Sequence, residues 1–191
     1  MKCTVTRKNE MSASVWSGGS TVQLFIYPPN TSYSARDFEV RISSASVESE
    51  SSIFTDLTGY HRLFMPLNSP IRLVYQNHGI VLADPLKVVE FDGGWRTTSY
   101  GVCTDLGVML ARGWQGEMEA AGCGAYTGRP GFNGVYALVD HVKVEANGNG
   151  CSQSSSLMQG DFLMLETQTT TELVLESPSP NGAVLIRIFK S

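Results

Sequence analysis

The side chains that could bind a metal ion are few and lie far apart in the sequence. The 191 residues include three histidines, His61, His78 and His141, and no two of them have the i, i+2 or i, i+4 spacing of a preformed ligand pair. No C-x-x-C pair occurs among the cysteines Cys3, Cys103, Cys123 and Cys151. We therefore expect no metal site and no cofactor.

Two glycine-rich stretches, 17–21 (SGGST) and 122–128 (GCGAYTG), superficially resemble phosphate-binding loops. Neither leads into a helical pattern, and the second lacks the terminal lysine of such a loop. The many serines include none in a G-x-S-x-G motif. The sequence therefore predicts neither a nucleotide site nor a serine nucleophile.

Arg41 and Arg62 are the charged residues best suited to binding a ligand. Arg41 lies between Val40 and Ile42 in an alternating pattern, and Arg62 begins an apolar run. An arginine inside a small barrel is costly unless it is paired, and its guanidinium can bind a carboxylate through two hydrogen bonds. The alternative, that both are ordinary surface arginines, stays open on the strand pattern alone.

The elements that must position these arginines are short β-strands. Phe38, Val40 and Ile42 alternate with polar residues, which is typical of a half-buried strand. Similar runs occupy 22–27, 61–67, 71–76, 87–91, 97–103, 105–110, 134–146, 161–166, 171–176 and 183–189. The best helix candidate, 111–122, is weakened by Gly113 and Gly116. We expect an all-β sandwich or barrel.

The segment 113–134 is rich in glycine and shows little strand pattern. We expect a single domain over 1–191, with a first lobe at about 1–112, a connection at 113–133 and a second lobe at about 134–191. The length of the connection favours a functional or pocket-covering loop over a hinge. Residues 147–150 (NGNG) and 152–156 (SQSSS) indicate turns.

The composition argues against several classes of partner. Hydrophobic residues make up 42% and charged residues 17%, with a net charge of −4 and no run of Lys or Arg. These values predict a globular protein with no nucleic-acid partner. No apolar segment has the length of a signal-peptide core or a membrane span, so we expect a cytoplasmic protein with no membrane partner.

Several motifs, taken in order, resemble the HutD/Ves family of bacterial proteins. The first is a Trp, paired glycines and a Thr before a strand, here Trp16, Gly18, Gly19 and Thr21. DFEVRISSASVES at 37–49 and FTDLTGYHRLFMPL at 54–67 follow, then EFDGGW at 90–95, TDLGVML at 104–110 and GDFLMLE at 160–166. The resemblance covers roughly 15–166. Departures occur at Ser17 and Gly107, where the family often has Asn, and after Glu50.

The resemblance implies an all-β bicupin: two double-stranded β-helix, jelly-roll-like barrel lobes in one compact chain. It also implies a cytoplasmic protein without a catalytic metal. The HutD branch is associated with histidine utilisation and with binding a carboxylate intermediate such as urocanate or formylglutamate. The Ves branch is associated with stress response.

On this basis we predict a non-enzymatic protein that binds a small carboxylate. The expected ligand-binding residues are Trp16, Gly18, Gly19, Thr21, Arg41, Ser43, Arg62 and Asp105. Both arginines are expected to bind the carboxylate, and Asp105 to orient an arginine or accept a ligand N–H. Two alternatives stay open: a metal-independent isomerase or lyase with His61 or Asp105 as base, and a stress-related interaction protein with an empty barrel. A homodimer paired through sheet edges is also left open.

Overall fold

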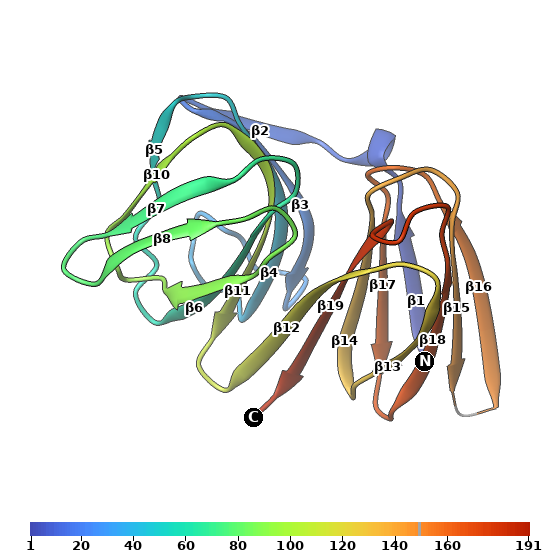
Figure 1. Ribbon diagram of the computed structural model, residues 1–191. Helices are drawn as coiled ribbons and strands as arrows, with labels where there is room; N and C mark the ends of the chain where they lie inside the picture. The colour runs from blue at the N-terminus through green and yellow to red at the C-terminus, as the bar shows by residue number, and fades with distance from the viewer. Residues whose placement is uncertain (149) are drawn as a thin grey trace. The chain divides into compact units, whose positions relative to one another are not determined.

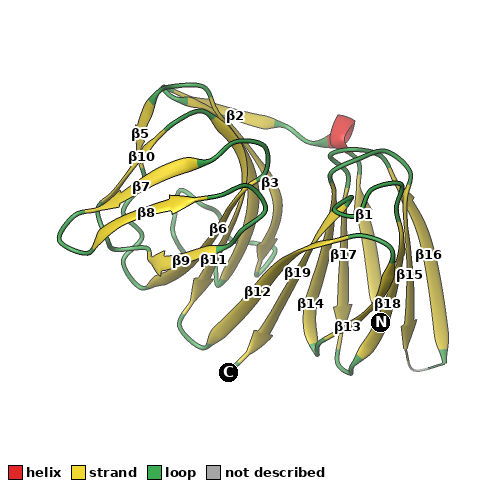
Figure 2. Cartoon of the chain, viewed as in Figure 1, coloured by secondary structure: helices red, strands yellow, loops and turns green. Residues whose placement is uncertain are grey.

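The computed structural model describes residues 1–148 and 150–191, and its regular structure is almost entirely β (Figures 1 and 2). The one helical element of the described residues is a 3-10 turn, η1 (Lys8–Glu10). The described residues form two compact units. Unit 1 contains Met1–Met11 and Gln115–Ser191, and unit 2 contains Ser12–Trp114. The all-β class predicted from the period of two is confirmed.

Unit 2 consists of a six-stranded and a four-stranded antiparallel sheet. The six-stranded sheet has the order β2 (Ala13–Trp16), β3 (Gly19–Tyr27), β4 (Val40–Val47), β11 (Cys103–Ala111), β6 (Tyr60–Pro66) and β9 (Val89–Asp92). The four-stranded sheet has the order β5 (Ser51–Ile53), β10 (Thr97–Tyr100), β7 (Ile71–Tyr75) and β8 (Gly79–Ala83).

Unit 1 has a five-stranded and a four-stranded sheet. The five-stranded sheet has the order β1 (Lys2–Thr6), β17 (Phe162–Thr167), β14 (Gly131–Ala137), β19 (Ala183–Lys190) and β12 (Trp114–Ala121). The four-stranded sheet has the order β13 (Gly124–Gly128), β18 (Thr171–Glu176), β15 (Val142–Gly148) and β16 (Cys151–Leu157).

The observed boundaries differ from the expected lobes in two places. Residues 1–11 belong with the second half of the chain, because β1 pairs with β17 along its whole length. The segment 113–133 is no loop but contains β12, β13 and the start of β14. Small residues there hide the alternation of a strand.

The predicted turns lie in or beside β16. The predicted hairpin tip at 152–156 lies inside β16, and the predicted turn at 147–150 includes position 149, outside the described residues.

A hydrophobic core lies between the two sheets of unit 2. Its buried members include Val47, Phe64, Phe91 and Cys103 from the larger sheet, and Leu73 from the smaller one. Successive side chains of a strand point to opposite faces. Residues an even number of positions from these core members on the same strand therefore face the same interior, which we call the lumen of unit 2.

Candidate functional site

Antiparallel pairing arranges the lumen-facing residues of β4, β11 and β6 in rows across the sheet. Met109 pairs with Arg41 on one side and Arg62 on the other, which we call the arginine row. Two positions along β11, Gly107 lies between Ser43 and Phe64. Two positions further, Asp105 lies between Ala45 and Pro66, which we call the aspartate row. The six-stranded sheet thus places both predicted arginines in one row of the lumen.

Arg41 is buried, with 6% of its surface exposed, and its hydrogen bonds go to uncharged groups. Its Nε donates to Oε1 of Gln23 at 3.1 Å, and its Nη1 donates to Oγ of Ser43 at 3.1 Å. The same Nη1 lies 3.8 Å from the sulfur of Met109. Ser43, a predicted site residue, is therefore in direct contact with the guanidinium.

Arg62 is equally buried, with 5% of its surface exposed, and is less well satisfied. Its Nη2 donates to the backbone oxygen of Thr55 at 2.6 Å. Its buried Nε has no hydrogen-bond partner. Buried guanidinium nitrogens are rarely left unpaired, so this atom points to a group that the lumen can still accept.

No carboxylate of the described residues forms an ion pair with Arg41 or Arg62. Burial lowers the pKa of both groups, and that of Arg62 falls to about 10. The positive charge of Arg41 contributes to the lowered pKa of Arg62, so the two guanidinium groups are close enough to repel. The exposed Asp56 interacts electrostatically with Arg62 but forms no ion pair with it. The two buried guanidinium groups therefore lack a carboxylate in direct contact, and they create a site that favours an anion.

Tyr33 covers this cationic site from the connection between β3 and β4. Its ring centroid lies 4.3 Å from Cζ of Arg41. Its electrostatic interaction acts on both Arg41 and Arg62. The strand pattern of the sequence does not mark Tyr33, although the length of the connection between two predicted strands is a usable signal. Nor does the pattern mark Gln23, which accepts a hydrogen bond from Arg41.

Aromatic rings complete the wall beside Arg62. Cζ of Arg62 lies 5.5 Å from the ring centroid of Phe54 and 5.9 Å from that of Phe91. The ring of Tyr75 lies 5.1 Å from that of Phe91, and its buried hydroxyl has no hydrogen-bond partner. Burial raises the pKa of Tyr75 to about 12, so this hydroxyl is a neutral donor at physiological pH. The lumen thus contains two orphaned donors near one aromatic ring.

Solvent reaches part of the lumen between the two rows. Thr21, Ala45, Gly107 and Met109 face inward, yet each is only half-buried. A side chain on Gly107 would meet one atom within 4 Å, Oγ of Ser43 at 3.9 Å. Gly107 therefore leaves open space beside the hydroxyl that holds Arg41.

Asp105 faces the same lumen but does not contact the arginines. Burial raises its pKa to about 8, and a backbone hydrogen bond from Ala45 only partly opposes this shift. No ion pair joins it to an arginine among the described residues. Asp105 is therefore not paired with an arginine in this structure, and its role in orienting an arginine or accepting a ligand N–H stays a prediction. Burial and Asp105 together raise the pKa of the neighbouring Cys103 thiol to about 12, which makes that cysteine a poor nucleophile.

Trp16 and Thr21 lie at the aspartate end of the lumen. Trp16 packs against the core of unit 2, and its Nε1 donates to Oγ1 of Thr21 at 3.1 Å. Ser17 and Gly18 form the turn between β2 and β3, and Ser17 is exposed. A side chain on Gly18 would clash with the Trp16 ring.

The backbone of Gly19 lies close against the neighbouring strand β4. A Cβ there would lie 1.9 Å from the backbone oxygen of Ser46 on β4. Its φ of +151° also disfavours a side chain. In the structure, Gly18 and Gly19 therefore make room for the protein's own tryptophan and backbone, and their predicted contact with a ligand stays a prediction.

His61 lies outside the lumen. It precedes Arg62 on β6, so the two side chains point to opposite faces. Its Nε2 lies 2.8 Å from Oε2 of the exposed Glu90. Of the two bases named for the enzyme alternative, only Asp105 faces the lumen.

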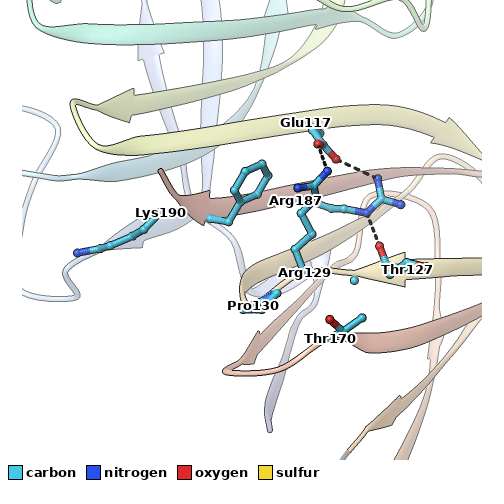
Figure 3. Close-up of a pocket in the computed structure, with 9 residues that line it drawn as sticks. Glu117, Thr127, Arg129, Pro130, Thr170, Arg187 and Lys190 are labelled. Carbon is cyan, nitrogen blue, oxygen red and sulfur yellow. Dashed lines mark hydrogen bonds and ion pairs between the residues drawn. The ribbon is translucent and has the colours of Figure 1, made fainter.

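A groove of about 580 Å³ opens in unit 1, with Glu117, Arg129 and Arg187 in its lining (Figure 3). Nη1 of Arg187 lies 2.6 Å from Oε1 of Glu119 and 3.8 Å from Oε2 of Glu117, and its Nε donates to the backbone oxygen of Thr127. Nη2 of Arg129 lies 2.7 Å from Oε1 of Glu117. These cations already have carboxylate partners, so the groove is a weaker anion site than the lumen of unit 2.

No three His, Cys, Asp or Glu side chains of the described residues gather into a group that could hold a metal ion. Within the same part of the chain, no helix is long and apolar enough to span a membrane. The predicted lack of a metal cofactor and the cytoplasmic location stay predictions.

The fold is similar to that of cupin proteins such as oxalate decarboxylase. Oxalate decarboxylase from Bacillus subtilis aligns with a TM-score of 0.67 at 8% identity, over 98% of this chain and 77% of that chain. A conserved protein of unknown function from Pseudomonas aeruginosa PAO1 aligns with a TM-score of 0.84 at 20% identity, over 98% and 99% of the two chains. The predicted bicupin fold is confirmed.

The particular family follows from the sequence. The HutD family model matches residues 8–181, so the chain belongs to the HutD family. HutD from Pseudomonas fluorescens SBW25 has a TM-score of 0.79 at 18% identity, over 100% of both chains. A search among curated proteins found no match. Family membership supports an association with histidine utilisation. The match is wider than the 15–166 expected from the motifs.

Proposed function

We propose that this protein binds a small carboxylate in the lumen of unit 2 and acts without catalysing a reaction. The ligand carboxylate accepts hydrogen bonds from Arg41 and Arg62, and Tyr33 covers it. As a member of the HutD family, the protein would bind an intermediate of histidine utilisation, such as urocanate or formylglutamate, and thereby moderate the pathway.

The observation that carries this proposal is the pair of buried guanidinium groups without a carboxylate partner. Removing an ion from water costs several kcal/mol, which a fold normally offsets with an ion pair. Arg41 and Arg62 instead have neutral partners, and Nε of Arg62 has none. A bound carboxylate would supply both the missing charge and the missing acceptor.

Small carboxylates also accompany two structural relatives. HutD from P. fluorescens was solved in a formate condition, and an oxalate decarboxylase from Lactobacillus farciminis was solved as a formate complex. Both are distant in sequence, at 18% and 7% identity. They support the class of ligand and leave its identity to experiment.

Thermal unfolding with a panel of small acids tests the proposal. A ligand at a hundred times its dissociation constant should add about 2.7 kcal/mol of stability. Urocanate, formylglutamate, formate and related acids would be compared on the wild type, on Arg41→Ala and on Arg72→Ala. Arg72 is the matched control, because it is an exposed arginine of the same unit. Absence of any shift in the wild type, or an equal shift in Arg41→Ala, would overturn the proposal.

Asp105 favours a second candidate, a metal-independent lyase or isomerase. Its raised pKa of about 8 would let it exchange a proton near neutral pH, in the lumen that holds the two arginines. Incubation with the same acids, followed by NMR, separates the two functions. Turnover that disappears in Asp105→Asn would establish the enzyme, and binding without turnover favours the first proposal.

A further inference from the structure

Strand β8 is an apolar edge of the four-stranded sheet in unit 2. It pairs with β7 on one side and is the last strand in the sheet order. Its sequence GIVLA contains no charge and no proline. Ile80, Val81 and Leu82 are exposed by 66%, 36% and 63%. An edge with unpaired backbone groups and apolar side chains is well suited to pairing with another strand.

Several other edge strands of the two units carry features that discourage such pairing, although the four-residue β2 exposes Val15. β5 has only three residues, and β12 carries Glu117 and Glu119. β16 is mostly serine, and β1 begins with Lys2. Short edges and charged or polar edge residues reduce strand addition. Among these edges, β8 combines several exposed apolar side chains with no charged residue.

We propose that β8 pairs antiparallel with β8 of a second copy of this chain, about a two-fold axis that passes through Val81. A two-fold axis normal to the sheet makes the same strand its own partner and continues the sheet across the dimer. The pairing satisfies outward backbone groups of both edges and needs no other protein. It is independent of the carboxylate site, because β8 contributes none of the residues that contact Arg41 or Arg62.

The side chains select this register over its neighbours. With the axis at Val81, Ile80 lies opposite Leu82 of the second copy, and these residues form an apolar cluster on one face. An axis at Leu82 would place Ile80 opposite the carboxylate of Asp84. An axis at Ile80 would place Leu82 opposite His78. Only the register centred on Val81 pairs apolar residues with one another along the strand.

The same register gives complementary partners at the strand ends. Asp84 follows β8 and His78 precedes it, and both residues are exposed. His78 stacks on Trp95, with 4.1 Å between ring centroids, which holds it at the end of the strand. In the proposed pair, Asp84 of one copy takes the register position opposite His78 of the other. An imidazole N–H that donates to a carboxylate at such cross-strand positions favours pairing.

Sedimentation analysis of the full chain tests the interface. We expect a dimer for the wild type, and an increase of about a hundredfold in the dissociation constant for Leu82→Lys, because a symmetric contact contains the substitution twice. Ile53→Lys is the matched control, since Ile53 is 65% exposed on the opposite edge of the same sheet. A monomeric wild type, or equal loss in Ile53→Lys, would overturn the proposal. Circular dichroism establishes that both variants are folded.

Disulfide crosslinking tests the register. In a background with the exposed Cys123 and Cys151 replaced by serine, Val81→Cys places two cysteines at directly opposed positions, within the Cα separation that a disulfide spans. Ile80→Cys places them diagonally, beyond that separation. Oxidation should therefore crosslink Val81→Cys and not Ile80→Cys on a non-reducing gel. The reverse result, or no crosslink in either variant, would contradict the proposed register.

Discussion

Both units turn arginines toward their interiors, but among the described residues only the inward arginine of unit 1 forms an ion pair. Arg187 faces the interior of unit 1 and contacts Glu119 at 2.6 Å. Arg41 and Arg62 face the lumen of unit 2 and contact neutral oxygens. The same residue type thus completes a network within the protein in one unit and is available to an external anion in the other. Arg41, Arg62 and Arg187 are buried to a similar extent, so burial does not distinguish them. The difference between the units is whether a carboxylate lies beside the guanidinium.

The largest expected effect comes from removing an unpaired arginine. Arg41→Met should weaken carboxylate binding by about a hundredfold or more, because a buried charge-assisted contact is lost. It should leave stability unchanged or higher, since an uncompensated buried charge also disappears. Isothermal titration and denaturant unfolding measure the two quantities. A large loss of stability in Arg41→Met would show that the arginine is structural, which would break the contrast between the units.

Asp105 should make the stability of unit 2 depend on pH. Its pKa is about 8 in the folded protein and near 3.8 in the unfolded chain, so the folded state holds the proton more tightly between these values. The stabilisation is complete below about pH 4 and is lost as pH rises toward 8. Between pH 5 and 7 the wild type should lose at most about 3 kcal/mol relative to Asp105→Asn.

Urea unfolding of both proteins at each pH provides the measurement. Parallel pH profiles for the wild type and Asp105→Asn would contradict the raised pKa. Carboxylate affinity should also fall above pH 8, because ionised Asp105 adds a negative charge to the lumen that receives the ligand. The Asn variant should lack this fall.

Arg187→Met should have the opposite effect to Arg41→Met. It removes the partner of Glu119 and of the Thr127 backbone oxygen, so we expect a loss of about 2 kcal/mol in the free energy of unfolding. Carboxylate affinity should stay within twofold of the wild type, since the site lies in unit 2. Calorimetric unfolding and titration check both expectations. Loss of carboxylate binding in Arg187→Met would show that the carboxylate site lies in unit 1 and not in unit 2.

The smallest effect is expected at Tyr33. Tyr33→Phe keeps the ring over Arg41 and removes only the hydroxyl, so affinity should fall by about twofold to fivefold. Tyr33→Ala removes the ring as well and should cost more. Equal affinities in both variants and the wild type would show that Tyr33 does not cover the ligand.

Much of the fold could be predicted from local pattern. The alternation of Val40 and Ile42 is a property of one strand, β4, and it correctly implied that Arg41 faces the side opposite to these two core residues. Phe38, which continues the same pattern, lies before the strand begins. The same alternation separated His61 from Arg62. The strands at 113–133 were missed because Gly113 and Gly116 interrupt the pattern, and their pairing partners lie far away in the sequence.

The sequence by itself determined that this chain is all-β, that it belongs with the HutD proteins, and which arginines were worth examining. These conclusions depend on residue types and on spacing within single strands. Only the tertiary structure decided that Arg41 and Arg62 share one row, that Asp105 forms no ion pair with them, and that the ring of Tyr33 lies over Arg41. Register between distant strands sets those neighbours. Whether a buried charge is compensated depends on side chains that only the fold brings together.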